Sequence, residues 1–492
     1  MNSLIIQKLN QSPKLLEAKV KAKVGQKLRK ISNHYVYLMP DKPYKKGLFI
    51  FRRDLRVVDN NGLNYANSVC ESVVPVFIFT PEQIDKNPYK SNNAILFMLE
   101  CLEDLSSEIN SMGGHLLFFY GKNETVIPRI VKHLGIDFVC FNGDYTPYAV
   151  ARDTRILGWC QKNDIDAEVR DDYCLNEPYT IKPYQKFTPY YATAVKKRVA
   201  QPVPKRAVHF ASQRVPSAVN IAQIRRRFTV SEPDGGRLSH GGRQSGLKQM
   251  TVASRIMRSY ARTRDDLSSH TSELSPHIKF GTVSIREVYD RFKDNDTFKR
   301  QLYWRDFYAQ IVFHFSHVIG HALKDNYNRI NWHFNANWFK RWCNGTTGFP
   351  AVDAGMRQLN ATGYMHNRCR MIVSSFLTKI LLIDWRRGEK YFAQKLTDYD
   401  PANNNGGWQW SAGTGADAQP YFRIFNPFLQ SKEHDKDCEY IKMWIPELKD
   451  VPPEAIHKWG ETFSEYETEY PEPMVNYAEQ KEKALKMYSR IF

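Results

Sequence analysis

Three stretches in the C-terminal half combine aromatic, cationic and carboxamide side chains at short spacing. Residues 301–308 read QLYWRDFY, residues 363–371 read GYMHNRCRM, and residues 398–410 read DYDPANNNGGWQW. Aromatic faces beside cations suit a stacked base or a planar cofactor. Amides and acids can hydrogen-bond the edge of a heteroaromatic ring. Any one stretch could be an aromatic core, but the three together favour a binding site for a planar ligand.

A fourth stretch, TSELSP at 271–276, offers hydroxyl groups at the start of an expected helix. Ser275 is a good N-cap residue and Pro276 is a good first helical residue. Hydroxyls and unpaired N–H groups at a helix start suit a phosphate or pyrophosphate. The same pattern is also typical of an ordinary helix cap.

Two other patterns resemble binding motifs but lack the context that those motifs need. His314, His317 and His321 could share one helix face, yet no acid or cysteine nearby completes a metal site, so we predict no metal. GTGADA at 413–418 matches a dinucleotide fingerprint without the preceding strand that it requires. GxSxG, Walker and HExxH motifs do not occur, so hydrolase and nucleoside triphosphatase functions have no support.

Positive charge is concentrated in two segments. The chain has 70 Lys and Arg against 52 Asp and Glu, a net charge of +18. Residues 1–34 carry eight basic residues and one acid, and residues 196–243 carry eleven basic residues and two acids. A polyanion such as nucleic acid is the natural partner, with non-specific attraction from residues 196–243. The alternative is that both segments are merely solvated.

Short apolar runs rich in β-branched and aromatic residues lie at 47–51, 73–79, 115–119 and 136–141. Helical periodicity falls between them. It is clearest in a helix predicted to begin near the N-cap Ser91 and to end at Gly113-Gly114. Strands that alternate with helices predict βαβ units and a parallel sheet.

These patterns predict four segments. Residues 1–44 form a basic extension, residues 45–175 an α/β domain, residues 176–243 a partly extended connection rich in Pro, Gly and Arg, and residues 244–492 a helical domain. The extension could be a basic amphipathic helix that acts as a nuclear or DNA-binding arm, another targeting segment, or an inert tail.

Composition predicts an intracellular protein, in the nucleus of a eukaryote or otherwise in the cytoplasm. No apolar run reaches the roughly 18 residues of a membrane helix, and the start lacks the pattern of a secretory leader. The eight cysteines are never closer than 14 residues, which favours buried thiols in a reducing compartment. No obligate partner is evident, and we expect a monomer.

These segments, with FRRDLRVVDNNGL at 51–63, closely resemble the photolyase/cryptochrome family. The run from 342 to 427 is the most specific, with GFPAVDAGMRQLNATGYMHNRCRM, IDWRRGEKYF, NNNGGWQW and YFRIFNP. The resemblance covers roughly residues 46–485 and is closest to class I cyclobutane pyrimidine dimer photolyases. It implies a Rossmann-like α/β domain with a parallel sheet, which holds an antenna pigment in some members, followed by an all-α FAD-binding domain.

The resemblance also implies which residues bind FAD. They are Tyr260, Thr271, Ser272, Glu273, Leu274, Ser275, Arg305, Asp398, Tyr399, Asp400 and Asn404. Asn404 would lie near the flavin N5, where a carboxamide suits a reduced, protonated ring and favours repair over light sensing. Trp408, Trp385 and Trp332 match the family's tryptophan chain for photoreducing oxidised flavin.

A second set would bind damaged DNA: Arg264, Gln301, Trp304, Arg305, Tyr308, Asn367, Arg368, Met371, Trp410 and Arg423. Trp304 and Trp410 would flank a flipped-out dimer, and arginines would contact phosphates. The (6-4) photolyases carry histidines, used for proton transfer, where Asn367 and Met371 stand. Gln301 is the one position that favours the (6-4) enzymes, which have Gln there, whereas dimer-specific enzymes usually have Glu.

The implied function is light-dependent DNA repair, in which excited FADH⁻ transfers an electron to a flipped-out cyclobutane pyrimidine dimer and splits it. This makes the protein a deoxyribodipyrimidine photo-lyase. The alternatives are a (6-4) photolyase, a cryptochrome-like photosensor, and a DNA-binding scaffold that lost repair through Gln301. The folate-binding glutamate of some relatives has no match in residues 145–153. A deazaflavin antenna, a folate held differently, or no antenna all stay open.

Overall fold

Five strands form one parallel sheet at the N-terminal end of the described chain. They are β1 (Tyr44–Phe51), β2 (Cys70–Phe79), β3 (Leu117–Tyr120), β4 (Phe138–Asn142) and β5 (Asp166–Arg170), in the order β3-β2-β1-β4-β5. The computed structural model describes residues 42–491 except 86, 214, 217 and 229–235. Nearly all of the basic extension, including its predicted amphipathic helix, therefore lies outside the described residues.

The four predicted strands are confirmed, and β5 is the strand that the sequence analysis missed. Its residues, DAEVR, carry two acids and an arginine, and none of them is buried. An edge strand buries little side-chain surface, so it shows little of the apolar pattern by which strands are found in a sequence. Pairing with β4 keeps it in place through backbone hydrogen bonds.

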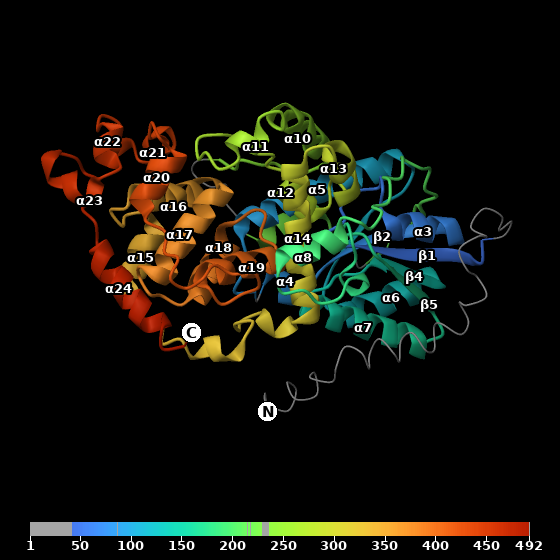
Figure 1. The fold of residues 1–492 in the computed structure, drawn as a ribbon. Helices are drawn as coiled ribbons and strands as arrows, with labels where there is room; N and C mark the ends of the chain where they lie inside the picture. The colour runs from blue at the N-terminus through green and yellow to red at the C-terminus, as the bar shows by residue number, and fades with distance from the viewer. Residues whose placement is uncertain (1–41, 86, 214, 217, 229–235, 492) are drawn as a thin grey trace.

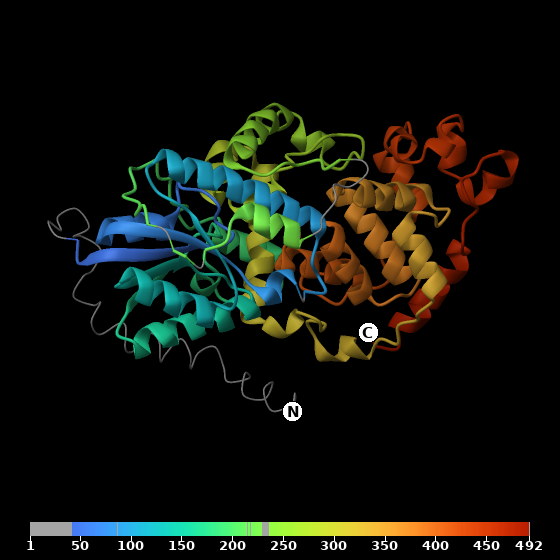
Figure 2. The same cartoon turned by 180° about the vertical axis from the view of Figure 1, so that it is seen from behind.

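Helices cover both faces of the sheet (Figure 1). They are α3 (Asn61–Val69), α4 (Pro81–Ile84), α5 (Asn92–Ser111), α6 (Asn123–Leu134) and α7 (Pro147–Lys162). The prediction for α5 is confirmed, since the Ser91 hydroxyl accepts from the Ala94 N–H at 3.2 Å and the helix ends just before Gly113. Figure 2 shows α5 running from the sheet toward the helical part of the molecule.

The connection between the two parts is more ordered than the sequence suggested. It contains a short 3-10 turn (Pro178–Thr180), α8 (Phe187–Ala194) and α9 (Ile221–Arg227). Its extended stretches form isolated bridges to the sheet, Phe210 with Val73 of β2 and Val219 with Phe118 of β3. The connection therefore covers part of one sheet edge.

The rest of the chain is helical. Its α-helices are α10 (Arg243–Ile256), α11 (Tyr260–Thr263), α12 (Ser275–Phe280), α13 (Ile285–Phe292), α14 (Asp296–His314), α15 (Ala336–Asn344), α16 (Pro350–Thr362), α17 (Asn367–Lys379), α18 (Trp385–Lys395), α19 (Pro401–Ala412), α20 (Pro427–His434), α21 (Glu439–Trp444), α22 (Pro453–Ile456), α23 (Trp459–Thr462) and α24 (Tyr477–Tyr488). Between residues 316 and 465 lie 3-10 turns at Ser316–Val318, Asp325–Arg329, Pro446–Leu448 and Phe463–Glu465.

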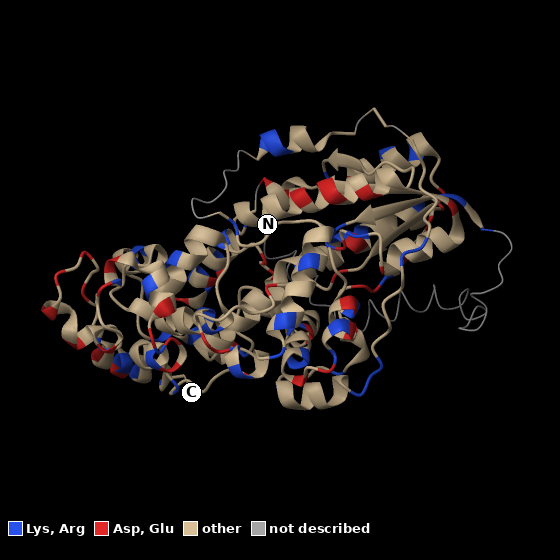
Figure 3. Cartoon of the chain, turned by 90° about the horizontal axis from the view of Figure 1, so that it is seen from above, with Lys and Arg blue, Asp and Glu red and all other residues tan. Residues whose placement is uncertain are grey.

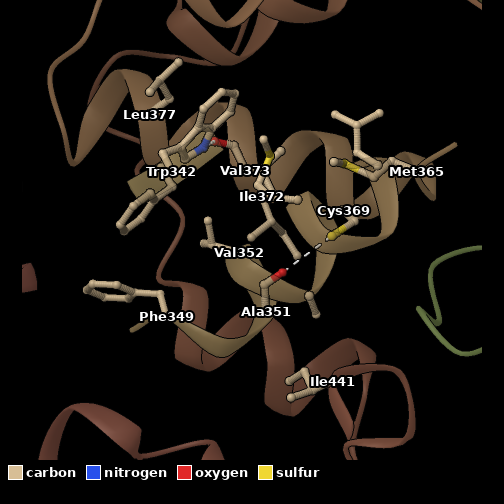
Figure 4. Packing of buried hydrophobic residues seen from close by; sticks show 14 of the residues in the cluster. Trp342, Phe349, Ala351, Val352, Met365, Cys369, Ile372, Val373, Leu377 and Ile441 are labelled. Carbon is tan, nitrogen blue, oxygen red and sulfur yellow. Dashed lines mark hydrogen bonds between the residues drawn. The ribbon is translucent and has the colours of Figure 1, made fainter. Parts of the chain in front are cut away.

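The largest apolar core of the described chain lies in this helical part. Trp342 is fully buried and donates its indole N–H to the Val373 carbonyl at 3.1 Å. Cys369 packs beside Ile372 and lies 3.5 Å from the Ala351 carbonyl, as Figure 4 shows. All eight cysteines are buried free thiols, as predicted. Among the described helices, none is long and apolar enough to cross a membrane.

Candidate functional site

Helices α14 and α19 pack together and carry residues from two of the three aromatic stretches. Gln301, Trp304, Arg305 and Tyr308 recur at helical spacing along α14. The Tyr308 ring lies directly on the backbone of α19, because a Cβ added at Gly406 would be 2.0 Å from its Cδ1. A glycine at this position is what allows the two helices to approach so closely.

Trp304 is half-buried, and a residue of the connection covers one of its faces. The Phe187 ring of α8 stacks on it with centroids 3.8 Å apart and planes 5° apart. The Arg300 guanidinium also lies over the Phe187 ring, 5.2 Å from its centroid. Phe187 escaped the sequence analysis because nothing local distinguishes it from an ordinary core aromatic.

The third aromatic stretch places Asn367 and Met371 one turn apart on α17. The Asn367 Nδ2 lies 3.7 Å from the Met371 Sδ, and α17 packs against α19. Arg368 pairs with Asp265 at 2.8 Å, which brings the neighbouring Arg264 to the same end of α17.

Two further residues of the predicted DNA-binding set also lie in the helical domain. Trp410, near the end of α19, is half-buried. Arg423 is exposed and donates to the Gln419 side chain at 3.1 Å. Among the described residues, neither Trp410 nor Arg423 is hydrogen-bonded to Asn367 or Met371.

The start of α19 is the most polar buried part of the site. Asp400 is its N-cap, and its Oδ1 accepts from the Ala402 and Asn403 N–H groups at 3.1 and 3.0 Å. Burial alone would raise the pKa of the Asp400 carboxyl, but Arg53, Arg305 and hydrogen bonds from Asn403 lower it far below its usual value. Asp400 is therefore a fixed negative charge.

The neighbours of Asp400 are held by equally specific contacts. Arg370 pairs with Asp398 at 2.9 Å, and Asn404 donates its amide to the Glu389 carbonyl at 3.0 Å. Tyr399 lies against Tyr89 with ring centroids 6.5 Å apart. Arg305 donates to the Tyr173 carbonyl at 2.6 Å, so this side chain of α14 also reaches the end of the α/β domain.

Segment 271–275 lies near the loop that precedes α17. The Thr271 and Tyr364 hydroxyl oxygens are 3.1 Å apart, and the Ser272 carbonyl accepts from Gln249. Tyr260 is buried against Phe298, with ring centroids 5.5 Å apart.

The prediction that Ser275 caps a helix is wrong. Leu274 is the N-cap and Ser275 is the first residue of α12, without a side-chain cap bond. The chain turns one residue early because Glu273 adopts a left-handed conformation, with φ of 52°, and the Leu274 side chain is fully buried. The Glu273 carboxylate lies 2.9 Å from His270.

Two of the three tryptophans of the predicted chain are buried, and the third is partly exposed. Trp408 and Trp385 are 2% and 1% exposed, and Trp332 is half-buried. The Trp408 ring lies on the backbone of α18, since a Cβ at Gly388 would be 2.1 Å from its Cη2. Trp385 is the first residue of that helix, and the Trp332 ring lies 6.0 Å from that of Tyr488.

Several buried polar atoms of the site have no protein partner. Among the predicted site residues these are one acceptor, Asp398 Oδ1, and two donors, Trp408 Nε1 and Arg368 Nε. Buried polar atoms are rarely left unpaired. The atoms present here therefore fit a bound group that offers both donors and acceptors, as a flavin ring system does.

Some of the charge expected to attract nucleic acid is compensated within the chain. We define the α5 seam as the pairs Arg225–Glu103, Lys205–Glu108, Arg237–Glu100 and Arg227–Asp85, at 3.0, 2.9, 2.5 and 3.3 Å. Across the molecule, acidic and basic residues alternate rather than gather in one place (Figure 3). The expected attraction from residues 196–243 is therefore weakened at these four residues.

The three histidines do not form a cluster of metal ligands. His314 Nε2 lies 3.1 Å from the Pro178 carbonyl, and His317 Nε2 lies 3.1 Å from the Leu323 carbonyl. In the part of the chain that the structure describes, no group of three potential ligands could hold a metal ion.

The chain matches two known protein-family models. Residues 298–490 match the model described as the FAD binding domain of DNA photolyase, and residues 48–207 match the model described as DNA photolyase. The chain belongs to the DNA photolyase family. This photolyase is an FAD-dependent enzyme with the family's two-domain architecture.

Individual relatives are similar to this protein over about nine tenths of its chain. The deoxyribodipyrimidine photo-lyase of Halobacterium salinarum is 35% identical over 90% of this chain and 98% of its own length. The photolyase structure from Sulfolobus tokodaii, described as holding two FAD molecules, is 40% identical with a TM-score of 0.83, over 91% of this chain and all of that chain. A Synechocystis cryptochrome is 26% identical, with a TM-score of 0.80 over 91% of this chain and all of that chain.

Proposed function

We propose that this photolyase repairs cyclobutane pyrimidine dimers in ultraviolet-damaged DNA, acting as a monomer. The observation that carries the lesion class is the pair Asn367 and Met371 on one face of α17, 3.7 Å apart, beside helix α19. Neither side chain can transfer a proton as histidine does, and the (6-4) reaction depends on such a transfer.

FAD would be held by the segments around Tyr260, by 271–275, and by the polar start of α19 with Arg305. Bound FAD, in its reduced form, supplies the light-driven electron that opens the dimer. Asn404 is proposed to face the flavin, with its amide oriented through the hydrogen bond to Glu389. Trp408, Trp385 and Trp332 are proposed to link this buried site to a partly exposed position.

The lesion would be bound outside the duplex, against Trp304 and Trp410. Trp304 is half-buried and stacks on Phe187 through one face of its indole, and we assign the opposite face to a base. Gln301, Tyr308 and Asn367 would hydrogen-bond or pack against the pyrimidines, while Arg264, Arg368 and Arg423 would contact phosphates. DNA affinity should fall steeply with salt.

The decisive experiment uses two duplexes, one with a defined cyclobutane thymine dimer and one with a defined (6-4) product. Under blue light, the purified FAD-loaded protein should remove the first lesion and leave the second. Repair of the (6-4) product alone would mean that Gln301 decides the lesion class. Repair of neither, with FAD bound, would favour a photosensor.

Two variants sharpen the assignment of the pocket. Asn367→Ala should lower affinity for dimer-containing DNA about tenfold, the effect of losing one or two buried hydrogen bonds. Asn163→Ala, at the exposed C-cap position that follows α7, is the matched control and should change nothing. Gln301→Glu should raise dimer repair if the missing carboxyl limits the rate, and unchanged repair would show that Gln301 is not limiting.

A second chromophore is supported at the carboxyl ends of β1 and β4, the point where the strand order reverses. Arg52 Nη2, Arg152 Nη2 and Tyr173 OH are buried there without a partner. Acid extraction followed by mass spectrometry would distinguish a deazaflavin, a folate, a second FAD and no antenna at all.

A further inference from the structure

The motif FRRDLRVVDNN, residues 51–61, carries the family resemblance but was given no role in the sequence analysis. In the structure it leaves the end of β1 and turns toward the helical domain. Arg56 donates to the Gly281 carbonyl at 3.1 Å and pairs with Asp172. Asp59 pairs with Arg286 at 3.0 Å and also accepts from the Ser284 hydroxyl. The motif is therefore a buried ionic staple between the two domains.

Arg53 is the residue of this staple that reaches the site itself. Its Nη2 lies 2.6 Å from Asp400 Oδ2, and its Nη1 lies 3.5 Å from Asp144 Oδ2. The Tyr145 hydroxyl lies 3.3 Å from the same Asp400 oxygen. The Arg53 and Asp400 side chains are only 11% and 8% exposed. Two side chains of the α/β domain, the Arg53 guanidinium and the Tyr145 hydroxyl, therefore contact Asp400.

The two carboxylate oxygens of Asp400 have different partners. Oδ2 faces Arg53, and Oδ1 accepts the first free N–H groups of α19. A carboxylate held at both oxygens cannot rotate without losing one set of bonds. The ion pair therefore fixes where α19 begins, and α19 carries Asn404 and Trp408 in its next two turns.

We propose that Arg53 is a positioning residue for FAD: the α/β domain, through Arg53, holds the Asp400 carboxylate in the orientation in which α19 presents its residues to the cofactor. The inference rests on the proposed placement of FAD at the start of α19. It gives the α/β domain a part in holding the flavin of the other domain, in addition to any pigment of its own.

The surroundings explain why arginine is needed. The planar guanidinium can serve Asp400 and Asp144 at once, whereas an ammonium is a single point charge. Arg305 also lowers the pKa of Asp400, but it donates to the Tyr173 carbonyl. Lys279 has no carboxylate within 4 Å among the described residues and lies over the Phe280 ring. It cannot take the place of Arg53 without moving.

The test is the pair Arg53→Gln and Arg243→Gln. Arg243 is a matched control because its side chain is equally buried, at 11% exposed, but it pairs with Glu287 at 2.7 Å rather than with Asp400. In the full-length protein we expect Arg53→Gln to release FAD at least tenfold faster and to lose the fine structure of the bound flavin's absorption spectrum. Arg243→Gln should keep both, and Arg53→Lys should lie between.

Two further variants keep the test decisive if Arg53→Gln folds poorly. Tyr145→Phe removes only the hydroxyl on Asp400 and should give a smaller shift of the same kind. Arg53→Gln combined with Asp400→Asn should release FAD no faster than the worse single variant, because both changes break one link. Equal FAD loss in the Arg243 and Arg53 variants, or unchanged FAD release and spectrum in Arg53→Gln, would overturn the proposal.

The readout also separates this inference from the proposed lesion class. A wild-type protein that binds FAD but repairs no dimer contradicts the lesion class and leaves the comparison of FAD release intact. A protein whose FAD release is insensitive to Arg53 contradicts the positioning role, whatever lesion it repairs.

Discussion

Two sets of ion pairs hold the α/β domain against the rest of the chain, and burial separates them. In the staple, Arg286 and Asp59 are 6% and 0% exposed. In the α5 seam, Arg225 and Glu103 are each 46% exposed. The staple is hydrogen-bonded on several sides, whereas most seam pairs are single contacts in solvent. Removing one partner of a buried pair leaves an uncompensated charge, while an exposed charge is simply solvated.

The staple and the α5 seam therefore contribute differently to the geometry of the site. The staple can position a helix start such as that of α19, because no alternative arrangement satisfies its charges. The seam compensates part of the positive charge of the connection and keeps it close to α5. Water can replace its exposed pairs, whereas Arg237, with its side chain 1% exposed, is the buried exception. The ion pairs that matter for the site are therefore the buried ones.

The largest effect should come from breaking the staple. Arg286→Met would leave Asp59 buried with Ser284 as its remaining side-chain partner and should lower the free energy of unfolding by about 3–5 kcal/mol. Urea denaturation followed by circular dichroism measures the change. The matched seam variant Arg225→Met should change the free energy by less than about 1 kcal/mol. Equal losses in the two variants would contradict the comparison.

Glu389 sharpens the comparison because it is a buried carboxyl without a cation in contact. Burial raises the pKa of Glu389 to about 7, although Asn405 donates to it at 2.9 Å. The folded state therefore favours the protonated carboxyl, and this stabilisation is complete below the ordinary pKa of 4.5 and is lost as the pH rises through about 7.

The free energy of unfolding of the wild type should accordingly fall by roughly 2–3 kcal/mol between pH 5 and pH 8, relative to Glu389→Gln. Urea titrations at a series of pH values give this difference. The exposed acid Glu482, changed to Gln, is the control and should leave the pH profile of the wild type unaltered. A profile of Glu389→Gln that matches the wild type would mean that Glu389 is ionised in the folded protein.

The smallest effect should come from the seam. Arg225→Gln combined with Arg227→Gln should lower the free energy of unfolding by at most about 1 kcal/mol at about 0.05 M NaCl, and the difference should shrink at about 0.5 M. Denaturation at the two salt concentrations tests this. If the loss of unfolding free energy is equally large at high salt, the seam pairs behave as buried ion pairs and the comparison is contradicted.

Much of the fold follows from local patterns. Four strands and the Ser91 cap of α5 were predicted from apolar runs and a capping residue, since those signals depend only on near neighbours. The weak strand β5 and the shift of the cap from Ser275 to Leu274 were not, because they depend on pairing with β4 and on the burial of Leu274. Both contacts join residues outside the local window from which secondary structure is predicted.

The residue types of the site were readable in the same way. The aromatic and amide stretches on α14, α17 and α19 indicated a planar ligand from residue types alone, and the family was indicated by the resemblance of these and neighbouring runs to the photolyase/cryptochrome family. Phe187, Glu389 and Arg53 were missed. Of these, only Arg53 had a signal in the sequence, its place in the motif at residues 51–61.

The sequence by itself therefore determined the elements, the two-domain order and the chemistry available to the ligand. Only the tertiary structure decided which charges meet. Arg53 and Asp400 are 347 residues apart in the chain and 2.6 Å apart in space. A pair so distant has no periodicity or spacing to reveal it, and its strength comes from burial that exists only when both domains are folded together.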